Sequence, residues 1–255
     1  MTTLRQIIQQ SLSLTAANMK SRYRRTFAGF IWVIMNPILL VTIQSLVFKN
    51  ILRITVDNYS LFLLGGLLPW IFISQTIDLS ASIFINSSNL LKCLDIHPLV
   101  IINAQLLENA FNYLSTFLIV LFFSTMGQGT FVKDLLLLFF PVSLLLLGTF
   151  LLSWIMATLN VFFRDTRFLI SVSFNLLFFI TPIFYPASLV PKTFQWLVLI
   201  NPVYHLIKPV RNAIYHYERS ELIQSCFMSS AISLIFLTCA IILWKNLKNE
   251  FYFKL

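Results

Sequence analysis

The chain has 255 residues, of which 58% are hydrophobic and only 11% are charged, with a mean hydropathy of +0.84 and a net charge of +9. Soluble globular domains carry about 25% charged residues, so this composition excludes a protein that presents its whole surface to water. The length allows one or two domains, but no long polar stretch separates them. The sequence therefore predicts a single all-α domain over residues 1–255 with lipid as its solvent.

Residues 1–29 are polar and cationic, and they lack the apolar core and cleavage site of a signal peptide. Apolar residues recur among them at helical spacing, which predicts a helix lying in the membrane interface with its apolar face toward lipid. Such a helix either serves only as a topology anchor, or acts as a gate or partner-docking helix that leads into the first span.

Six later segments are predicted to cross the membrane, because each approaches the about 20 apolar residues that a transmembrane helix needs. Pro37 in the first and Gly65, Gly66 and Pro69 in the second are tolerated where neighbouring helices satisfy the freed backbone groups. The predicted spans are Phe30–Phe48, Leu61–Ile77, Asn109–Met126, Leu135–Leu159, Phe168–Tyr185 and Phe227–Trp244.

The distribution of cations predicts the orientation of these spans. Five Lys or Arg residues and no acid precede the first span, and Arg164 and Arg167 lie between the fourth and fifth. Cytoplasmic loops are enriched in Lys and Arg, so both termini are expected in the cytoplasm. Cations beside the spans also contact anionic headgroups, so the net charge does not call for nucleic acid as a partner.

Two segments between spans are neither simple spans nor loose linkers. The stretch 78–108 contains a short amphipathic turn, and Pro98 disfavours helix at His97; it either projects toward a soluble partner or packs on the bilayer. The stretch 186–225 holds two short apolar patches around Asn201-Pro202. It predicts a re-entrant hairpin in the outer leaflet that lines a pathway, or a hairpin that lies flat at the interface.

Catalytic motifs are missing from the sequence. It contains no P-loop, no H-E-x-x-H and no G-x-S-x-G, and Cys93, Cys226 and Cys239 lack the spacing of a metal site. The spans contain almost no acids, which an ion-driven carrier would place at mid-membrane. We therefore expect no cofactor, metal or catalytic residue in this chain, and a source of energy outside it.

Charged residues near the predicted cytoplasmic ends of the spans are candidates for structural ion pairs. Glu108 and Arg164 are expected at the same depth, which suggests that they pair across the bundle. Arg164 and Asp165 are also expected to order the short loop between spans four and five.

Aromatic residues are concentrated near spans one, two and five. They either contact lipid and form an interfacial belt, or they line a passage in which their faces stack on the C–H faces of sugar rings. The candidates for a channel or outer gate are Trp32, Trp70, Phe72, Phe178, Phe179, Phe184 and Tyr185.

Several motifs together resemble the membrane subunits of polysaccharide ABC exporters, a type-2 ABC transporter family that exports O-antigen, capsule and wall teichoic acid. The resemblance covers nearly the whole chain, with the motifs in the same order and at similar spacing. The motifs are Arg22-Tyr-Arg-Arg-Thr-Phe-Ala-Gly-Phe-Ile-Trp32, Asn36-Pro37, Leu64-Gly-Gly-Leu-Leu-Pro-Trp70, Leu159-Asn-Val-Phe-Phe-Arg-Asp165, Phe179-Ile-Thr-Pro-Ile-Phe-Tyr185 and Asn201-Pro202.

The resemblance implies a homodimer of six-helix subunits in the bacterial inner membrane, with a channel for a lipid-linked glycan lined mainly by spans one and five. It implies two separate ATP-binding cassette subunits, which bind ATP and Mg²⁺. Spans two and five and the segment 186–225 would form the outer gate. The N-terminal helix would be the cytoplasmic gate, whose candidate residues are Arg22, Tyr23, Arg24, Arg25 and Phe27.

The resemblance also implies that segment 86–103 couples the permease to its ATPase. The family often has an aromatic or aliphatic residue before the proline of this segment, where the present chain has His97. The candidate coupling residues are Leu90, Leu91, Lys92, Leu94, Asp95, His97 and Pro98.

Three other functions fit parts of the sequence. An ABC export permease for a drug or small lipid would share every gross feature and differ in channel width and lining. A membrane enzyme, such as a glycan polymerase or acyltransferase, would need acids or histidines clustered on one face. An ion-coupled flippase would continue to work after ATP depletion. The sequence favours the polysaccharide exporter.

Overall fold

The computed structural model describes residues 4–24, 29–48, 56–94, 96–126, 135–215 and 218–255. All regular secondary structure in these ranges is helical, which confirms the all-α prediction. The helices are α1 (Leu4–Tyr23), α2 (Gly29–Leu46), α3 (Tyr59–Ala81), α4 (Ile83–Asn86), α5 (Ser88–Cys93), α6 (Pro98–Met126), α7 (Leu135–Phe162), α8 (Thr166–Ile180), α9 (Gln195–Ile200), α10 (Pro202–Ile214) and α11 (Arg219–Lys254), with 3-10 turns η2 (Ala187–Leu189) and η3 (Lys192–Phe194) before α9.

Each predicted span overlaps a helix, namely α2, α3, α6, α7, α8 or α11. By length and composition, three stretches of the described chain are long and apolar enough to cross a membrane: Tyr59–Ala81, Leu137–Phe162 and Arg219–Lys254. Met35–Leu46 and Thr166–Ile180 form shorter apolar helices. The chain is therefore an integral membrane protein.

The fifth predicted span is too long at its end. α8 stops at Ile180, and Thr181 has extended backbone with ψ of 125°. The reason is Pro182, which disfavours helical geometry at the preceding residue. The 15 residues of α8 extend only about 22 Å, less than the about 30 Å of bilayer hydrocarbon, and the non-helical chain from Thr181 onward must find other partners for its backbone groups.

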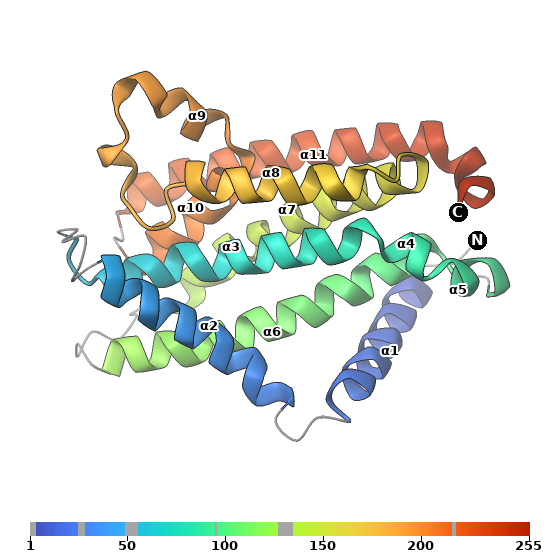
Figure 1. The fold of residues 1–255 in the computed structure, drawn as a ribbon, viewed down its shortest axis with the longest axis horizontal. Coiled ribbons are helices and arrows are strands. Elements are labelled where there is room, and N and C mark those ends of the chain that lie inside the picture. Colours follow the sequence, from blue (N-terminus) through green and yellow to red (C-terminus); the bar gives the residue numbers. More distant parts are fainter. Residues whose placement is uncertain (1–3, 25–28, 49–55, 95, 127–134, 216–217) are drawn as a thin grey trace.

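α3 lies at the centre of the helical bundle, where it contacts α2, α6, α7, α8 and α10. Its sequence is apolar on all sides, and most of its residues are buried, as expected for a helix enclosed by others. α10 packs into the same core against α3, α7 and α11. The two helices of segment 186–225 therefore differ in their surroundings. α10 is largely buried, whereas α9 stands away from the bundle with Trp196 and Leu199 exposed (Figure 1).

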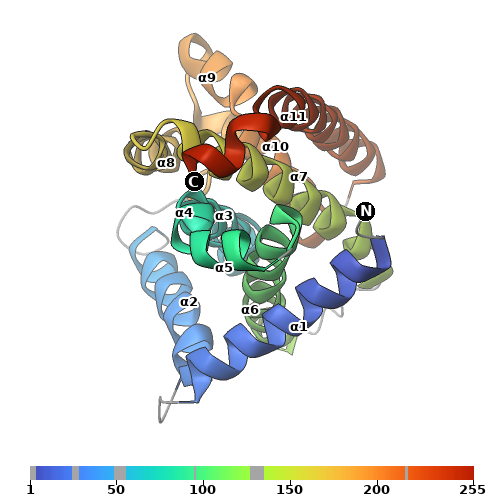
Figure 2. The ribbon, with the colours of Figure 1, turned by 90° about the vertical axis from the view of Figure 1, so that its right-hand side faces the viewer.

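α1 runs across one end of the bundle, along α6 (Figure 2). The Thr15 hydroxyl donates to the carbonyl of Ala104 at 3.4 Å, and Ser11 is buried on the same side. Ile8 and Leu12 face outward and are exposed. The outward side of α1 also carries polar and charged residues, among them Gln9 and Lys20, so the position of α1 in the membrane interface stays a prediction.

The short helices α4 and α5, the start of α1 and the end of α11 all lie at one end of the molecule (Figures 1 and 2). α11 has 36 residues and extends about 54 Å, which exceeds the hydrocarbon thickness. Its last turns reach α4, where the fully buried Phe251 packs edge-on against Phe84 at 5.1 Å between ring centroids. Trp154 and Trp244 complete this aromatic cluster.

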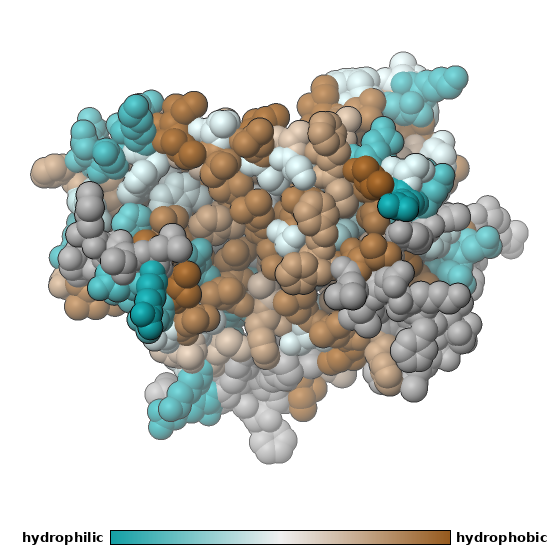
Figure 3. Space-filling model, turned by 180° about the vertical axis from the view of Figure 1, so that it is seen from behind, coloured by the Kyte–Doolittle hydropathy of each residue, from teal (hydrophilic) through white to brown (hydrophobic). Residues whose placement is uncertain are grey.

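The hydropathy of the surface changes along the long axis of the molecule. Apolar side chains cover the middle of the molecule, and hydrophilic ones gather toward its two ends (Figure 3). Large apolar side chains on α8 and α11 are exposed, among them Phe168, Phe179 and Phe227. A band of exposed apolar surface of this extent indicates contact with lipid or with another subunit.

Candidate functional site

The break after α8 is held by a buried arginine on α10. Arg211 Nη1 donates to the carbonyl of Pro182 at 2.6 Å, and Nη2 donates to the carbonyl of Ile183 at 3.2 Å. The guanidinium carbon lies 4.4 Å from the centre of the Phe62 ring. These contacts satisfy two carbonyls that follow the end of α8 and have no helical partner. Left without a hydrogen bond in a water-poor environment, each carbonyl would cost several kcal/mol.

Two further hydrogen bonds hold the same break. The Tyr59 hydroxyl at the start of α3 donates to the carbonyl of Phe184 at 2.8 Å. The Asn201 amide donates to the Thr181 hydroxyl at 2.7 Å, and its carbonyl oxygen accepts from Val203 N at 3.0 Å, which caps α10. We call the group formed by Tyr59, Thr181, Asn201 and Arg211, with the carbonyls of 182–184, the Arg211 latch.

The glycine pair of α3 makes room for this arginine. A Cβ at Gly66 would overlap with Arg211 Nη2, and a Cβ at Gly65 would lie 2.9 Å from the Arg211 Cα. Both glycines are needed for the close approach of α10 to α3 rather than for an unusual backbone conformation. The Gly-Gly pair, the Thr-Pro break and the Asn-Pro pair, which are far apart in the sequence, therefore meet at one place.

Sequence reasoning did not single out Arg211. The one signal available was the pattern of α10, because Arg211 lies four residues after Ile207 on its apolar side. Charged residues at buried positions of membrane proteins mark functional or structural centres. The re-entrant hairpin stays a prediction for the segment 186–225, in which α10 is the buried helix.

The predicted channel aromatics divide into two groups. Trp32 on α2 and Phe179 on α8 are 63% and 75% exposed. Trp70 is buried against Phe174 and Phe178, and Phe184 is buried against Phe48 and Phe178. Phe72 packs on Tyr113, and the Tyr185 hydroxyl donates to the carbonyl of Phe179. Within one chain, only Trp32 and Phe179 of these present open faces.

The predicted coupling segment forms α5 and the turn before α6. Leu90, Lys92 and Leu94 are exposed, whereas Leu91 is buried in the aromatic end of the core. Pro98 is the first residue of α6, as expected from its effect on His97. Asp95 lies outside the described residues.

His97 makes contacts within its own chain. Its Nδ1 accepts from the backbone N–H of Leu99 at 3.2 Å, and its ring lies 6.2 Å from that of Trp244. Burial lowers the pKa of the His97 imidazole below its ordinary value. The neutral ring therefore caps α6, which is a role that the aromatic or aliphatic residues of the resembled family could not perform.

The predicted pairing of Glu108 with Arg164 is wrong. Glu108 Oε1 lies 2.8 Å from Arg22 Nη1, and the Glu108 side chain is only 2% exposed. Because α6 begins at Pro98, Glu108 stands about 15 Å along the helix, where the end of α1 crosses it. Arg164 and Asp165 are both exposed in the turn between α7 and α8.

Among the other candidate gate residues, Arg24 is exposed just after α1. Tyr23 is the last residue of α1, and the structure describes only its backbone. Arg25 and Phe27 lie outside the described residues.

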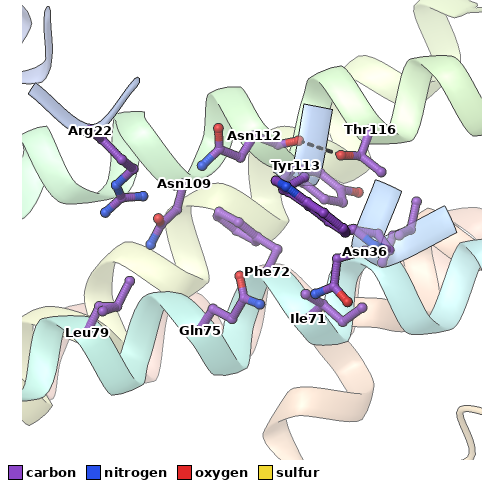
Figure 4. A pocket seen from close by; sticks show the side chains of 13 residues that line it. Arg22, Asn36, Ile71, Phe72, Gln75, Leu79, Asn109, Asn112, Tyr113 and Thr116 are labelled. Carbon is purple, nitrogen blue, oxygen red and sulfur yellow. Dashed lines mark hydrogen bonds between the residues drawn. The ribbon is translucent and has the colours of Figure 1, made fainter. Parts of the chain in front are cut away.

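A cavity of about 300 Å³ opens between α2, α3 and α6, next to the Arg22–Glu108 pair (Figure 4). Four carboxamides line it, and the side chains of Asn109 and Asn112 on α6 and Gln75 on α3 point into the space between these helices. We call it the amide pocket. Its polar and aromatic lining consists of Arg22, Trp32, Asn36, Phe72, Gln75, Asn109, Asn112, Tyr113 and Thr116.

Within the described residues, no three His, Cys, Asp or Glu side chains are grouped so that they could hold a metal ion. Residues 9–215 match the family described as ABC-2 type transporter. The chain belongs to this family. The match includes the Arg211 latch, the amide pocket and α5, and ends just after α10.

Curated relatives of the chain include O-antigen export permeases and a polysialic acid transport protein. It is 30% identical over 214 residues to "O-antigen export system permease protein RfbA" of Klebsiella pneumoniae, which covers 80% of this chain and 81% of the relative. It is 29% identical over 244 residues to the protein of the same name from Myxococcus xanthus, with 94% and 93% covered. "Polysialic acid transport protein KpsM" of Escherichia coli is 23% identical, with 79% and 80% covered.

Proposed function

We propose that this chain is the membrane-spanning subunit of an ATP-driven exporter, which moves a lipid-linked polysaccharide of the O-antigen type across the bacterial inner membrane. The observation that carries the proposal is the similarity to O-antigen export permeases at 29–30% identity over 80–94% of the chain. ATP hydrolysis belongs to a separate ATP-binding cassette subunit, and the present chain acts as a transport subunit rather than an enzyme.

In this proposal the end that holds α4, α5, the start of α1 and the end of α11 faces the cytoplasm. Six spans then connect it to the outer face, and the Arg211 latch lies near that face. The exposed side chains Leu90, Lys92 and Leu94 on and after α5 contact the ATPase, and the buried Leu91 anchors the helix to the core. Movement of the ATPase is passed to α6 through the turn capped by His97.

Two copies of the chain enclose the passage. One chain leaves an unpartnered apolar face on α2 and α8, where Trp32 and Phe179 are exposed. Six helices per chain are too few to enclose a glycan, so the faces of two copies line it together, with the N-terminal helix α1 as the cytoplasmic gate. The Arg211 latch holds the chain after α8 in its closed position, and its release opens the outer end.

Deletion of the gene tests this proposal in its host. The expected result is loss of the surface polysaccharide with accumulation of the lipid-linked glycan inside the inner membrane, restored by the chain together with its ATPase. The chain and the ATPase should co-purify, and Leu90→Asp with Leu94→Asp should separate them, whereas Leu199→Asp on the exposed α9 should not. Unchanged surface polysaccharide in the deletion strain, or export that persists after ATP depletion, would contradict the proposal.

A further inference from the structure

We propose that a groove between α3 and α8 contacts the glycan during its passage through the membrane, and that Asp78 and Asn175 are glycan-contacting residues, which bind hydroxyl groups of the sugar units. The inference rests on the proposed function, since it names where that exporter touches its cargo. The groove has a volume of about 230 Å³, and its lining includes Ser74, Gln75, Asp78, Ser171, Phe174 and Asn175. We call it the α3–α8 groove.

The central helix α3 reaches the molecular surface at this groove. Between Leu61 and Ala81, its exposed residues are Gln75, Asp78 and Leu79, which all lie in its last two turns. Two of these three residues are polar, although the helix as a whole is apolar. α3 is therefore apolar where other helices cover it and mainly polar where it is open.

The polar side chains of the groove have no partner of their own. Gln75, Asp78 and Asn175 form no side-chain hydrogen bond or ion pair with another residue of the described chain. Asn175 is the tenth residue of α8 and lies about 14 Å from its start, which in the proposed orientation is inside the hydrocarbon. An unpaired carboxylate or carboxamide is costly against lipid and belongs on a water-filled cavity or a substrate path. The groove is therefore expected to face the passage.

The groove opens on the side of the chain that the proposed passage uses. α3 contacts both α2 and α8, and these two helices flank it on the same side of the molecule (Figure 2). Asn175 lies one turn before the exposed Phe179, on the same side of α8. Gln75 also lines the amide pocket, so polar groups continue from the groove toward α2 and α6. A glycan between two copies would thus meet the groove directly.

The chemistry of the lining favours hydroxyl groups over phosphate. The Asp78 carboxylate accepts hydrogen bonds and repels anions, whereas the carboxamides of Gln75 and Asn175 both donate and accept. The hydroxyl groups of a sugar need both kinds of partner. Arg167 on α8 is exposed but does not line the groove, so its charge does not neutralise Asp78 there.

The groove holds one side of a sugar rather than enclosing it. Its volume of about 230 Å³ lies below the about 300 Å³ at which closed small-ligand pockets begin. Phe174 supplies aromatic surface, and its ring is packed 5.8 Å from that of Trp70 between centroids. An open groove of this size binds weakly, which suits an exporter because each sugar unit must leave the site before the next arrives.

Access of water to the groove is tested in the complex of this chain with its ATPase, reconstituted in lipid nanodiscs. Cys93, Cys226 and Cys239 are replaced by Ser, and Asn175→Cys is labelled with a charged, water-soluble thiol reagent. Leu234→Cys on α11, where the native side chain is 60% exposed, is the matched control at a position expected to face lipid. Asn175→Cys should react about tenfold faster than the control. Equal rates would overturn the inference, because the groove would then face lipid or be closed by the second copy.

Contact with the glycan is tested by protection of the same cysteine. The probe is the lipid-linked glycan extracted from the strain in which the gene is deleted, and the control is the same extract from a strain that cannot make the glycan. The glycan should slow labelling of Asn175→Cys about threefold, whereas the control extract should leave the rate unchanged. Equal slowing by both extracts, or no slowing by either, would overturn the inference.

Loss of the polar groups separates glycan contact from folding. Asp78→Leu and Asn175→Leu should each slow the appearance of the surface glycan about fivefold, and Asn175→Gln, which keeps the carboxamide, should retain most of the rate. Because these side chains have no partner in the chain, the melting temperature and co-purification with the ATPase should stay unchanged. Ser173→Leu, at an exposed position of α8 outside the groove, is the control. Normal export by both leucine variants, or equal slowing by the control, would overturn the inference.

Deletion of the gene distinguishes this inference from the proposed function. If the lipid-linked glycan accumulates and protects the groove, both stand. If it accumulates but neither labelling nor export depends on the groove, only the inference fails. If deletion leaves the surface glycan in place, the proposed function fails.

Discussion

The two ends of the bundle are stabilised by different kinds of interaction. At the Arg211 latch, hydrogen bonds from Arg211 and Tyr59 hold backbone carbonyls that no helix satisfies. At the opposite end, Phe84 and Phe251 pack in an aromatic cluster. Hydrogen bonds are directional and can be exchanged for others, whereas packed rings resist small displacements. In the proposed exporter, this difference would let the latch end open while the aromatic end moves as a rigid unit.

Replacing Arg211 with Met should have the largest effect on this comparison. The carbonyls of Pro182 and Ile183 lose charge-assisted hydrogen bonds, and we expect a loss of about 4 kcal/mol in the free energy of unfolding. The buried Cys226 thiol on α11, which packs against α10, reports local opening. With Cys93 and Cys239 replaced by Ser, its labelling rate should rise, and Lys208→Met on α10 is the control. An unchanged rate and melting temperature would show that the latch does not hold this end.

Phe251→Ala tests the opposite end. Loss of the ring leaves a cavity between Phe84 and Trp244, and we expect a loss of about 3 kcal/mol, at the low end for such substitutions because the last turn of α11 can adjust. Co-purification with the ATPase should weaken, because the cluster supports α4 and α5. Labelling of Cys226 should stay unchanged, and Phe253→Ala, which removes an exposed ring, is the control. Increased labelling of Cys226 would mean that the two ends are not independent.

Gly66→Ala tests the close approach of α3 and α10. The added methyl group would overlap with the Arg211 guanidinium, and the repacking should cost about 2 kcal/mol. Gly148→Ala is the matched control, because its methyl group would overlap with the buried Leu206 side chain, which is apolar and can move without breaking a hydrogen bond, so the cost should be smaller. Thermal unfolding in detergent measures both. Equal melting temperatures for the two variants would argue against a rigid latch.

His97→Ala should have the smallest effect. Loss of the cap on α6 should cost about 1 kcal/mol near neutral pH. Because burial lowers the pKa of His97, the unfolded chain binds a proton at this side chain more readily than the folded chain does. The contribution of the cap to the free energy of unfolding is therefore present above about pH 6.5. It is lost as the pH falls through that value and then through the lowered pKa of the folded state. His97→Asn keeps an acceptor for the Leu99 N–H without titrating, and should abolish this part of the pH dependence. A melting profile with the same pH dependence in all three proteins would contradict it.

Hydropathy and charge alone predicted an all-helical membrane protein, and each predicted span overlaps a helix. Prolines explain where local prediction succeeded and where it failed. Pro98 correctly marks the start of α6, whereas Pro182 ends α8 earlier than its apolar pattern suggested. An apolar run continues through Ile183 and Phe184, so composition cannot tell a helix from a buried extended segment there.

The candidate site was less accessible to sequence reasoning. Its motifs were noticed separately, but their meeting around Arg211 was not, because it depends on the approach of α10 to the glycines of α3. The assignment of Glu108 to Arg164 failed for a similar reason. The boundaries of a helix set the depth of its charged residues in the membrane, and the start of α6 at Pro98 places Glu108 beside Arg22.

The amino-acid sequence by itself determined the solvent of this protein, its helical class and its family, since these depend on composition, periodicity and motif order. Only the tertiary structure decided which polar groups meet. In a chain with so few charges, each buried polar side chain must find a specific partner to offset its desolvation. That partner is set by how the helices cross, and neighbouring residues in the sequence do not reveal it.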